Sequence, residues 1–206
     1  MFTFDYGYAC NFSTNHFINQ STIYQNKYLY PMANYLAKLH QIKCFVFDVD
    51  GVLTDGMVLA LESGEQSRRF NIKDGYGIER ALLAGYHVAI ISGGNQIGVQ
   101  KRLDFLKIKQ VHLGVKDKIE VFNKLCNDLG VNASEVLYVG DDLPDYDVMK
   151  LAGLPCCPQD ATQEIKEISL YVSDKKGGEG CVRDVIERVM KVQGTWRKFE
   201  GENINN

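Results

Sequence analysis

From Lys43 onward, short apolar runs alternate with longer amphipathic stretches. The runs are short and lack polar alternation, which is typical of strands buried on both faces of a parallel sheet. Right-handed crossovers between such strands place helices on both faces. The sequence therefore predicts an α/β fold: a three-layer α/β/α sandwich with a central parallel sheet. The expected strands are 44–47, 87–91, 110–113, 136–140, 154–157 and 170–173, and the expected helices are 75–84, 95–106, 117–129, 144–152, 161–167 and 180–192.

One stretch departs from this rhythm. Residues 54–70 form two alternating segments around a turn with the sequence ESGE. This pattern predicts a β-hairpin that projects from the edge of the sheet as a small flap. Only a hairpin fits in this part of the chain, so we expect no cap domain over the sheet.

The composition changes near residue 31. Residues 1–31 contain only two charged side chains, Asp5 and Lys27, and show no useful helical or strand periodicity. We expect a poorly ordered N-terminal extension there. From Met32 onward the sequence looks like the usual beginning of a protein, so we interpret Met32 as the biological initiator. The alternative is that residues 1–31 are a genuine extension. The predicted domain then spans residues 32–196, and residues 197–206 form a C-terminal tail.

Charge and composition exclude several classes of protein. The net charge of −3 argues against a general nucleic-acid binder, which would carry a basic excess. No apolar run approaches the length that spans a bilayer, and no secretory signal is visible. The six cysteines form no CxxC pair, and the chain is long enough to bury a core without disulfides. We therefore expect free thiols and a cytoplasmic protein without membrane or nucleic-acid partners.

Polar side chains follow the predicted strands where each of them ends. Asp48 and Asp50 come after the first strand, Ser92 after the second, and Asp141 after the fourth. Lys118 follows the third strand, at the start of its helix. Ligands of such sheets bind beyond the carboxyl ends of the strands, so we expect these groups at one rim. A cluster of carboxylates needs a cation, and ligands that are all oxygen favour Mg²⁺.

This set of groups suits phosphoryl transfer. Asp48 is the expected nucleophile, which forms an aspartyl-phosphate, and Asp50 is the expected general acid and base. Ser92 donates to a phosphate oxygen, and Lys118 neutralises the phosphate while it pairs with Asp48. The predicted metal ligands are Asp48, the main-chain carbonyl of Asp50, and Asp141. Either of two further acids is expected to hold metal-bound water, Asp142 or Asp145.

At these residues the sequence resembles the haloacid dehalogenase (HAD) superfamily of phosphohydrolases. The four motifs are DVDGVLTDG at 48–56, Ser92 in ISGG, Lys118, and GDDLPD at 140–145. Together with FNIKDGYGI at 70–78 and GGEGCVRDV at 177–185, they resemble the 3-deoxy-D-manno-octulosonate 8-phosphate phosphatases. The resemblance covers residues 42 to about 196 and implies a Rossmann-like HAD core. It also implies Mg²⁺-dependent hydrolysis of a sugar-acid phosphate, in lipopolysaccharide precursor synthesis.

The resemblance further implies how substrate binds. Asp50 and Lys118 contact the substrate, as do Arg102 and the stretch Asn71, Ile72, Lys73, Asp74 and Gly75. It also implies a homotetramer, in which the hairpin and the C-terminal glycine loop of neighbouring subunits complete the active site. Such an assembly would supply the cover that a chain without a cap lacks.

Two positions depart from the family pattern. Gly94 and Glu79 stand where the family often has arginine. The absence of these two arginines removes two cations from a site for an acidic sugar, although the catalytic residues are all present. Four nearby basic residues are candidates to compensate, although the sequence pattern favours an ordinary surface charge for each of them: Arg68, Arg69, Lys73 and Lys101.

Two other functions therefore stay open. The first is the same chemistry on a nine-carbon sugar acid 9-phosphate, of the kind related to sialic acid. The second, from a different class, is a non-catalytic tetrameric binding module. A module of that kind is expected to lack at least one of Asp48, Asp50, Lys118 and Asp141, and none is missing.

Overall fold

The computed structural model describes residues 35–196 of the chain. The predicted N-terminal extension, the interpretation of Met32 and the predicted C-terminal tail lie outside these residues. No helix within 35–196 is long and apolar enough to cross a membrane.

The centre of the protein is a six-stranded sheet in which every pair of neighbouring strands is parallel. Its order is β5-β4-β1-β6-β7-β8. The sheet therefore confirms the predicted parallel architecture. The strands are β1 (Cys44–Phe47), β4 (His87–Ile91), β5 (Gln110–His112), β6 (Val136–Val139), β7 (Leu154–Cys157) and β8 (Tyr171–Val172).

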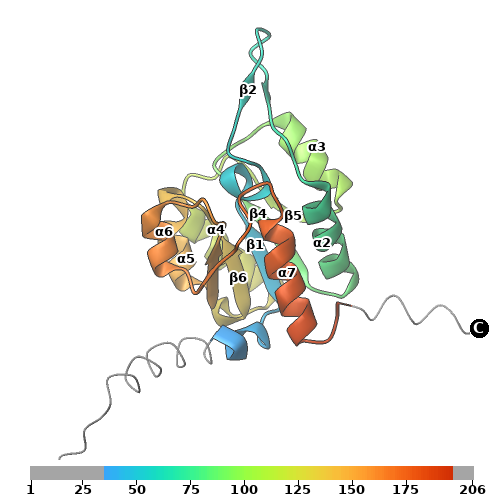
Figure 1. The fold of residues 1–206 in the computed structure, drawn as a ribbon, viewed down its shortest axis with the longest axis vertical. Helices are drawn as coiled ribbons and strands as arrows, with labels where there is room; N and C mark the ends of the chain where they lie inside the picture. The colour runs from blue at the N-terminus through green and yellow to red at the C-terminus, as the bar shows by residue number, and fades with distance from the viewer. Residues whose placement is uncertain (1–34, 197–206) are drawn as a thin grey trace, which may run out of the picture.

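Helices cover both faces of this sheet (Figure 1). One face packs against α2 (Ile72–Leu83), α3 (Ile97–Phe105) and α7 (Cys181–Val192). The other packs against α4 (Lys118–Leu129), α5 (Tyr146–Leu151) and α6 (Gln163–Ile168). The three-layer sandwich is therefore confirmed.

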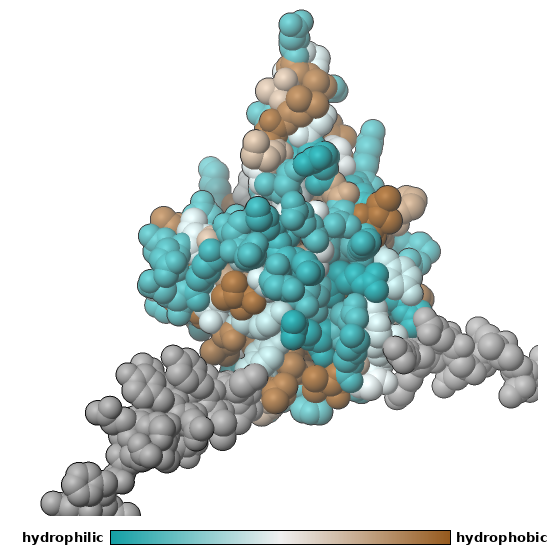
Figure 2. Space-filling view, viewed as in Figure 1, coloured by the Kyte–Doolittle hydropathy of each residue, from teal (hydrophilic) through white to brown (hydrophobic). Residues whose placement is uncertain are grey.

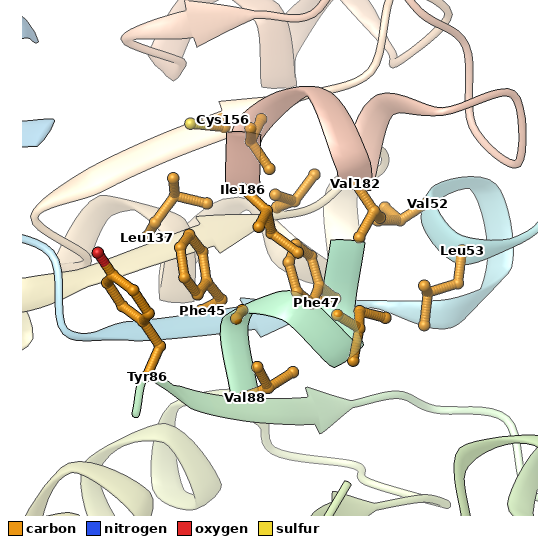
Figure 3. Packing of buried hydrophobic residues seen from close by; sticks show 14 of the residues in the cluster. Phe45, Phe47, Val52, Leu53, Tyr86, Val88, Leu137, Cys156, Val182 and Ile186 are labelled. Atoms are coloured by element: carbon orange, nitrogen blue, oxygen red, sulfur yellow. The ribbon is translucent and has the colours of Figure 1, made fainter. Parts of the chain in front are cut away.

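Successive residues of β1 show why its sequence is apolar throughout. Phe45 and Phe47 point to one core, where Val182 and Ile186 of α7 pack against the sheet (Figure 3). Cys44 and Val46 alternate with them and belong to the opposite core. All four side chains are fully buried, so an uninterrupted apolar run is what a central parallel strand requires.

The main differences from the predicted elements lie in two helices. Helix α2 begins at Ile72, three residues before the predicted start, because the Asn71 side chain accepts a hydrogen bond from the Lys73 N–H and caps it. The helix predicted over 144–152 is split into a 3₁₀ turn, η3 (Leu143–Asp145), and α5. Pro144 in the first turn of η3 is consistent with the helical start at this point.

The hairpin rises well above the rest of the molecule (Figure 1). Its strands, β2 (Leu59–Ala60) and β3 (Gln66–Ser67), are antiparallel and short. A short irregular turn, η1 (Val49–Leu53), connects β1 to this hairpin. Both segments lie at the carboxyl edge of the sheet.

Candidate active site

The carboxyl edge of the sheet brings four predicted site residues to one rim. Asp48 directly follows β1, Ser92 follows β4, and Asp141 lies two residues after β6. Lys118 opens α4, whose N-terminus is capped by the Asp117 side chain. Because β4, β1 and β6 are parallel neighbours, their ends point to the same place.

Three carboxylates form the centre of this rim. Asp48, Asp141 and Asp145 each place one oxygen within 4.8 Å of the others. The sequence predicts Asp145 only as one of two candidates to hold metal-bound water, but its side chain lies in the cluster itself. The side chain of Asp142 is exposed and accepts a hydrogen bond from the Leu143 N–H instead.

The electrostatics of this cluster favour a bound cation. Burial and the neighbouring charge of Asp48 raise the pKa of Asp141 to about 7. Burial and the charge of Asp145 likewise raise the pKa of Asp48, against the opposing effect of Lys118. In addition, the buried Oδ2 of Asp145 has no hydrogen-bond partner. An all-carboxylate donor set with an orphaned oxygen fits a hard divalent ion such as Mg²⁺.

Lys118 is buried between two of these acids. Its Nζ donates a hydrogen bond to Asp145 Oδ1 at 2.7 Å and lies 3.3 Å from Asp48 Oδ1. Burial lowers the pKa of Lys118, but the two carboxylates outweigh this effect and raise it. The lysine therefore stays charged beside the expected nucleophile.

Tyr138 is a member of this network that sequence analysis missed. Its hydroxyl donates to the same Oδ1 of Asp145, at 2.7 Å. Burial and the Asp145 charge raise the pKa of Tyr138, so the hydroxyl keeps its proton. Because Tyr138 lies inside the apolar run of β6, nothing in the sequence pattern distinguishes its polar end from an ordinary core residue.

Asp50 lies in the η1 turn, and its carboxylate faces the hairpin. Both of its oxygens accept hydrogen bonds from Arg68, Oδ1 from Nε at 2.6 Å and Oδ2 from Nη2 at 3.2 Å. Gly51 shapes this turn with a φ of +79°, and a Cβ at this position would lie 1.9 Å from Asp141 Oδ2. Glycine is therefore required where the first and last motifs meet.

Ser92 is almost fully buried at the end of β4. Its hydroxyl accepts a hydrogen bond from the Gly94 N–H at 3.3 Å, which shapes the turn after the strand. The role of Ser92 toward phosphate stays a prediction, as does metal binding by the main-chain carbonyl of Asp50.

The stretch predicted to bind substrate divides into two groups. Asn71 and Asp74 bind the C-terminal glycine loop (residues 177–180) and the start of α7: Asn71 Nδ2 donates to the Gly178 carbonyl, and Asp74 accepts from the Arg183 N–H. Burial raises the pKa of Asp74 to about 6, against the opposing effect of the backbone hydrogen bonds from Arg183 and Gly180. By contrast, Ile72 and Lys73 are exposed to solvent. Their contacts with substrate stay predictions.

Arg102, on α3, lines an open cleft between the hairpin and this helix. A Cβ on Gly75 would lie 2.7 Å from Nη2 of Arg102, so glycine at position 75 leaves room for the guanidinium. The buried Nε of Arg102 has no hydrogen-bond partner. Arg68 and Lys101 line the same cleft, which is therefore rich in cations.

Comparison with known proteins agrees with this geometry. The family model of haloacid dehalogenase-like hydrolases matches residues 111–186. The 3-deoxy-D-manno-octulosonate 8-phosphate phosphatase KdsC of Escherichia coli K12 is 37% identical over 172 residues, covering 84% of this chain and 92% of that protein. This chain belongs to the KdsC phosphatase family.

Solved structures of KdsC phosphatases have the same fold. The enzyme from Yersinia pestis gives a TM-score of 0.79 at 32% identity, covering 80% of this chain and 89% of that one. The enzyme from Moraxella catarrhalis gives a TM-score of 0.79 at 32% identity, covering 82% of this chain and 97% of that one. Its structure contains magnesium, phosphate and 3-deoxy-D-manno-octulosonate (KDO).

The glycine loop of this KdsC-family chain packs against its own first motif. A Cβ on Gly177 would lie 1.9 Å from the Gly51 carbonyl oxygen, and a Cβ on Gly178 would lie 2.6 Å from the Asp55 nitrogen. The Gly178 N–H also donates to the Val52 carbonyl. Within one subunit, the loop therefore supports the turn that carries Asp50, a contact that the sequence resemblance did not predict.

Proposed function

We propose that this protein hydrolyses KDO 8-phosphate to KDO and phosphate, with Mg²⁺ as its cofactor. The observation that carries the proposal is the buried cluster of Asp48, Asp141, Asp145 and Lys118 at the carboxyl edge of the sheet. Support for the sugar comes from the KdsC relatives, which align over most of their length. The cytoplasm and lipopolysaccharide precursor synthesis are the proposed setting.

The first half of the reaction transfers the phosphoryl group to the protein. An oxygen of Asp48 forms a bond to phosphorus while the bond from phosphorus to the sugar oxygen breaks. Asp50 donates a proton to that oxygen, so it leaves as a neutral hydroxyl group of the sugar rather than as an alkoxide. Asp50 is suited to this role because its carboxylate lies outside the acidic cluster and binds Arg68, which lines the open cleft.

The second half releases phosphate. Asp50 accepts a proton from water while the water oxygen attacks the aspartyl-phosphate, which restores the Asp48 carboxylate. Lys118 offsets the negative charge throughout, and Ser92 donates a hydrogen bond to a phosphate oxygen. Asp48 and Asp141 would hold Mg²⁺, with Asp145 close enough to contribute an oxygen or bind its water, and the ion would offset repulsion between the carboxylates and the phosphate.

A panel of phosphate esters tests this function. We expect the fastest Mg²⁺-dependent phosphate release from KDO 8-phosphate, and slower release from a nine-carbon sugar acid 9-phosphate and from hexose 6-phosphates. A preference for the nine-carbon acid would keep the chemistry and change the sugar, which Gly94 and Glu79 leave open. Failure to hydrolyse any ester, in a folded protein that binds Mg²⁺, would favour the non-catalytic binding module.

We also propose that the protein forms a homotetramer through the hairpin. Hydrophobic side chains gather on the projecting hairpin (Figure 2), where Met57 is 71% exposed and Leu59 is 64% exposed. An exposed apolar patch of this kind is typical of an interaction surface, and closed symmetry is the usual way for identical chains to cover it.

Light scattering after gel filtration tests the assembly. We expect the mass of four chains for the native protein and a smaller mass for a variant with both Met57→Asp and Leu59→Asp. The matched control is Leu151→Asp, because Leu151 is an exposed leucine on α5, away from the hairpin. An unchanged mass in the hairpin variant, or a monomeric native protein, would contradict this proposal.

A further inference from the structure

The hairpin delivers one buried arginine to the catalytic edge of the sheet. Arg68 directly follows β3, and its side chain is only 6% exposed. Its guanidinium holds both oxygens of Asp50 and also donates to the Gln66 carbonyl of the hairpin. A paired guanidinium and carboxylate fix each other's orientation more firmly than a single hydrogen bond does.

The next residue provides a natural comparison. Arg69 binds Asp55, but its side chain is 88% exposed. An exposed ion pair of this kind contributes little to stability or to orientation. The hairpin therefore carries two adjacent arginines, of which only Arg68 is buried against a residue of the proposed reaction.

Asp50 has little else to fix its side chain. Among residues 35–196, Arg68 is the side chain that donates hydrogen bonds to the Asp50 carboxylate. Gly94 is also close, since a Cβ at this position would be 3.4 Å from Asp50 Oδ2, but glycine provides no side chain to hold the acid. Asp50 is also 38% exposed at its side chain, so without Arg68 its carboxylate would be free to change rotamer.

We propose that Arg68 is a positioning residue, which holds the Asp50 carboxylate on the leaving-group side of Asp48. This inference rests on the proposed phosphatase function. Asp50 donates a proton to the sugar oxygen as the bond from that oxygen to phosphorus breaks, and Arg68 neither gains nor loses a proton. Misplacing a general acid by a rotamer change removes its contribution to the rate, which is commonly about 10²- to 10⁴-fold.

The choice of leaving group isolates this role. A sugar alkoxide is a poor leaving group and needs a proton from Asp50, whereas p-nitrophenolate leaves without one. The ratio kcat/KM reports only the steps up to formation of the aspartyl-phosphate, so later hydrolysis of that intermediate does not blur the comparison. A structural role for Arg68 would lower kcat/KM for both kinds of ester alike.

The experiment measures kcat/KM for three esters, KDO 8-phosphate, glucose 6-phosphate and p-nitrophenyl phosphate, with the Mg²⁺-loaded protein. For Arg68→Ala we expect a loss of at least about tenfold on both sugar phosphates and a change within about threefold on the aryl ester. The matched control Arg69→Ala should retain the native values on all three. Arg68→Lys should recover part of the loss, because it restores the charge without the paired geometry.

Each other result overturns the inference. Equal losses on the three esters would make Arg68 a structural residue of the hairpin, and a loss confined to KDO 8-phosphate would make it a binding group for the sugar acid. Native activity in Arg68→Ala would show that the ion pair has no role in the reaction. If Arg68→Ala does not fold, Arg68→Gln and Arg68→Lys carry the same comparison. A native protein that hydrolyses none of the esters would overturn the proposed function itself.

Discussion

Replacing Asp48 with asparagine is expected to lower kcat by at least about 10⁴-fold, because an amide cannot form the aspartyl-phosphate. No neighbouring acid can take over this role without a change of geometry. Lys118 still pairs with Asp145 in the variant, so the buried lysine keeps a carboxylate partner. The measurement is Mg²⁺-dependent phosphate release from KDO 8-phosphate.

The fold of this variant should remain intact. Burial and repulsion from Asp145 raise the pKa of Asp48, so the ionised side chain is unfavourable in the metal-free protein. A neutral isostere removes that cost, and we expect the metal-free variant to be at least as stable as the native chain.

Asp147→Asn is the matched control, because Asp147 is an exposed acid on α5 outside the cluster. It should show native activity and stability. Activity near the native level in Asp48→Asn would contradict the proposed mechanism. A large loss in thermal stability would instead show that Asp48 has a structural role.

Much of the sheet is predictable from the sequence because its strands are buried on both faces. Three strands have the predicted bounds, Cys44–Phe47, His87–Ile91 and Leu154–Cys157. Burial on both faces makes almost every position apolar, the exposed His87 at the start of β4 being the exception in these three strands, so the ends of the apolar run lie close to the ends of the strand. Shorter or edge strands lack this property, and Tyr171–Val172 is accordingly shorter than predicted.

The location of the candidate site was predictable for a related reason. Strands that are all parallel bring their carboxyl ends to one edge, so polar residues after successive strands must meet. The positions of Asp48, Ser92 and Asp141 at this edge therefore follow from the strand order without any side-chain detail. Groups that reach the edge by other routes do not follow from it.

Arg68 and Tyr138 reach it by such routes. Arg68 comes from a hairpin whose direction depends on the irregular turn at Gly51, and charge pattern alone does not distinguish Arg68 from Arg69. Tyr138 lies within an apolar strand, and its role depends on the 2.7 Å contact with Asp145, which only the folded chain creates. Long-range contacts between single side chains therefore set the limit of what the sequence predicts.

Removing divalent metal is expected to abolish activity, and Mg²⁺ is expected to stabilise the protein more at high pH than at low pH. Chelation by EDTA should stop phosphate release, and added Mg²⁺ should restore it. Ligand binding to the folded state alone adds stability, about 2.7 kcal/mol at a metal concentration 100 times Kd.

The pH dependence follows from the acidic cluster. Asp141 has a pKa of about 7 in the folded, metal-free protein, because of burial and the charge of Asp48, whereas an unfolded aspartate has a pKa of about 4. Between these values the folded state binds more protons than the unfolded state. Metal-free stability should therefore fall as pH rises from about 4 to about 7. Mg²⁺ binds the ionised carboxylates, so its stabilising effect should grow over the same range.

Thermal unfolding at pH 5 and pH 8, with EDTA or with Mg²⁺, measures both effects. We expect a larger Mg²⁺-induced rise in Tm at pH 8 than at pH 5. Asp141→Asn should reduce that rise and flatten the metal-free pH dependence, because it removes one ligand and its titration together. The control Asp147→Asn changes an exposed acid outside the cluster, so it should retain both the Mg²⁺-induced rise in Tm and the metal-free pH dependence. An equal Mg²⁺ effect at the two pH values, or an unchanged effect in Asp141→Asn, would mean that the ion binds elsewhere than between these carboxylates.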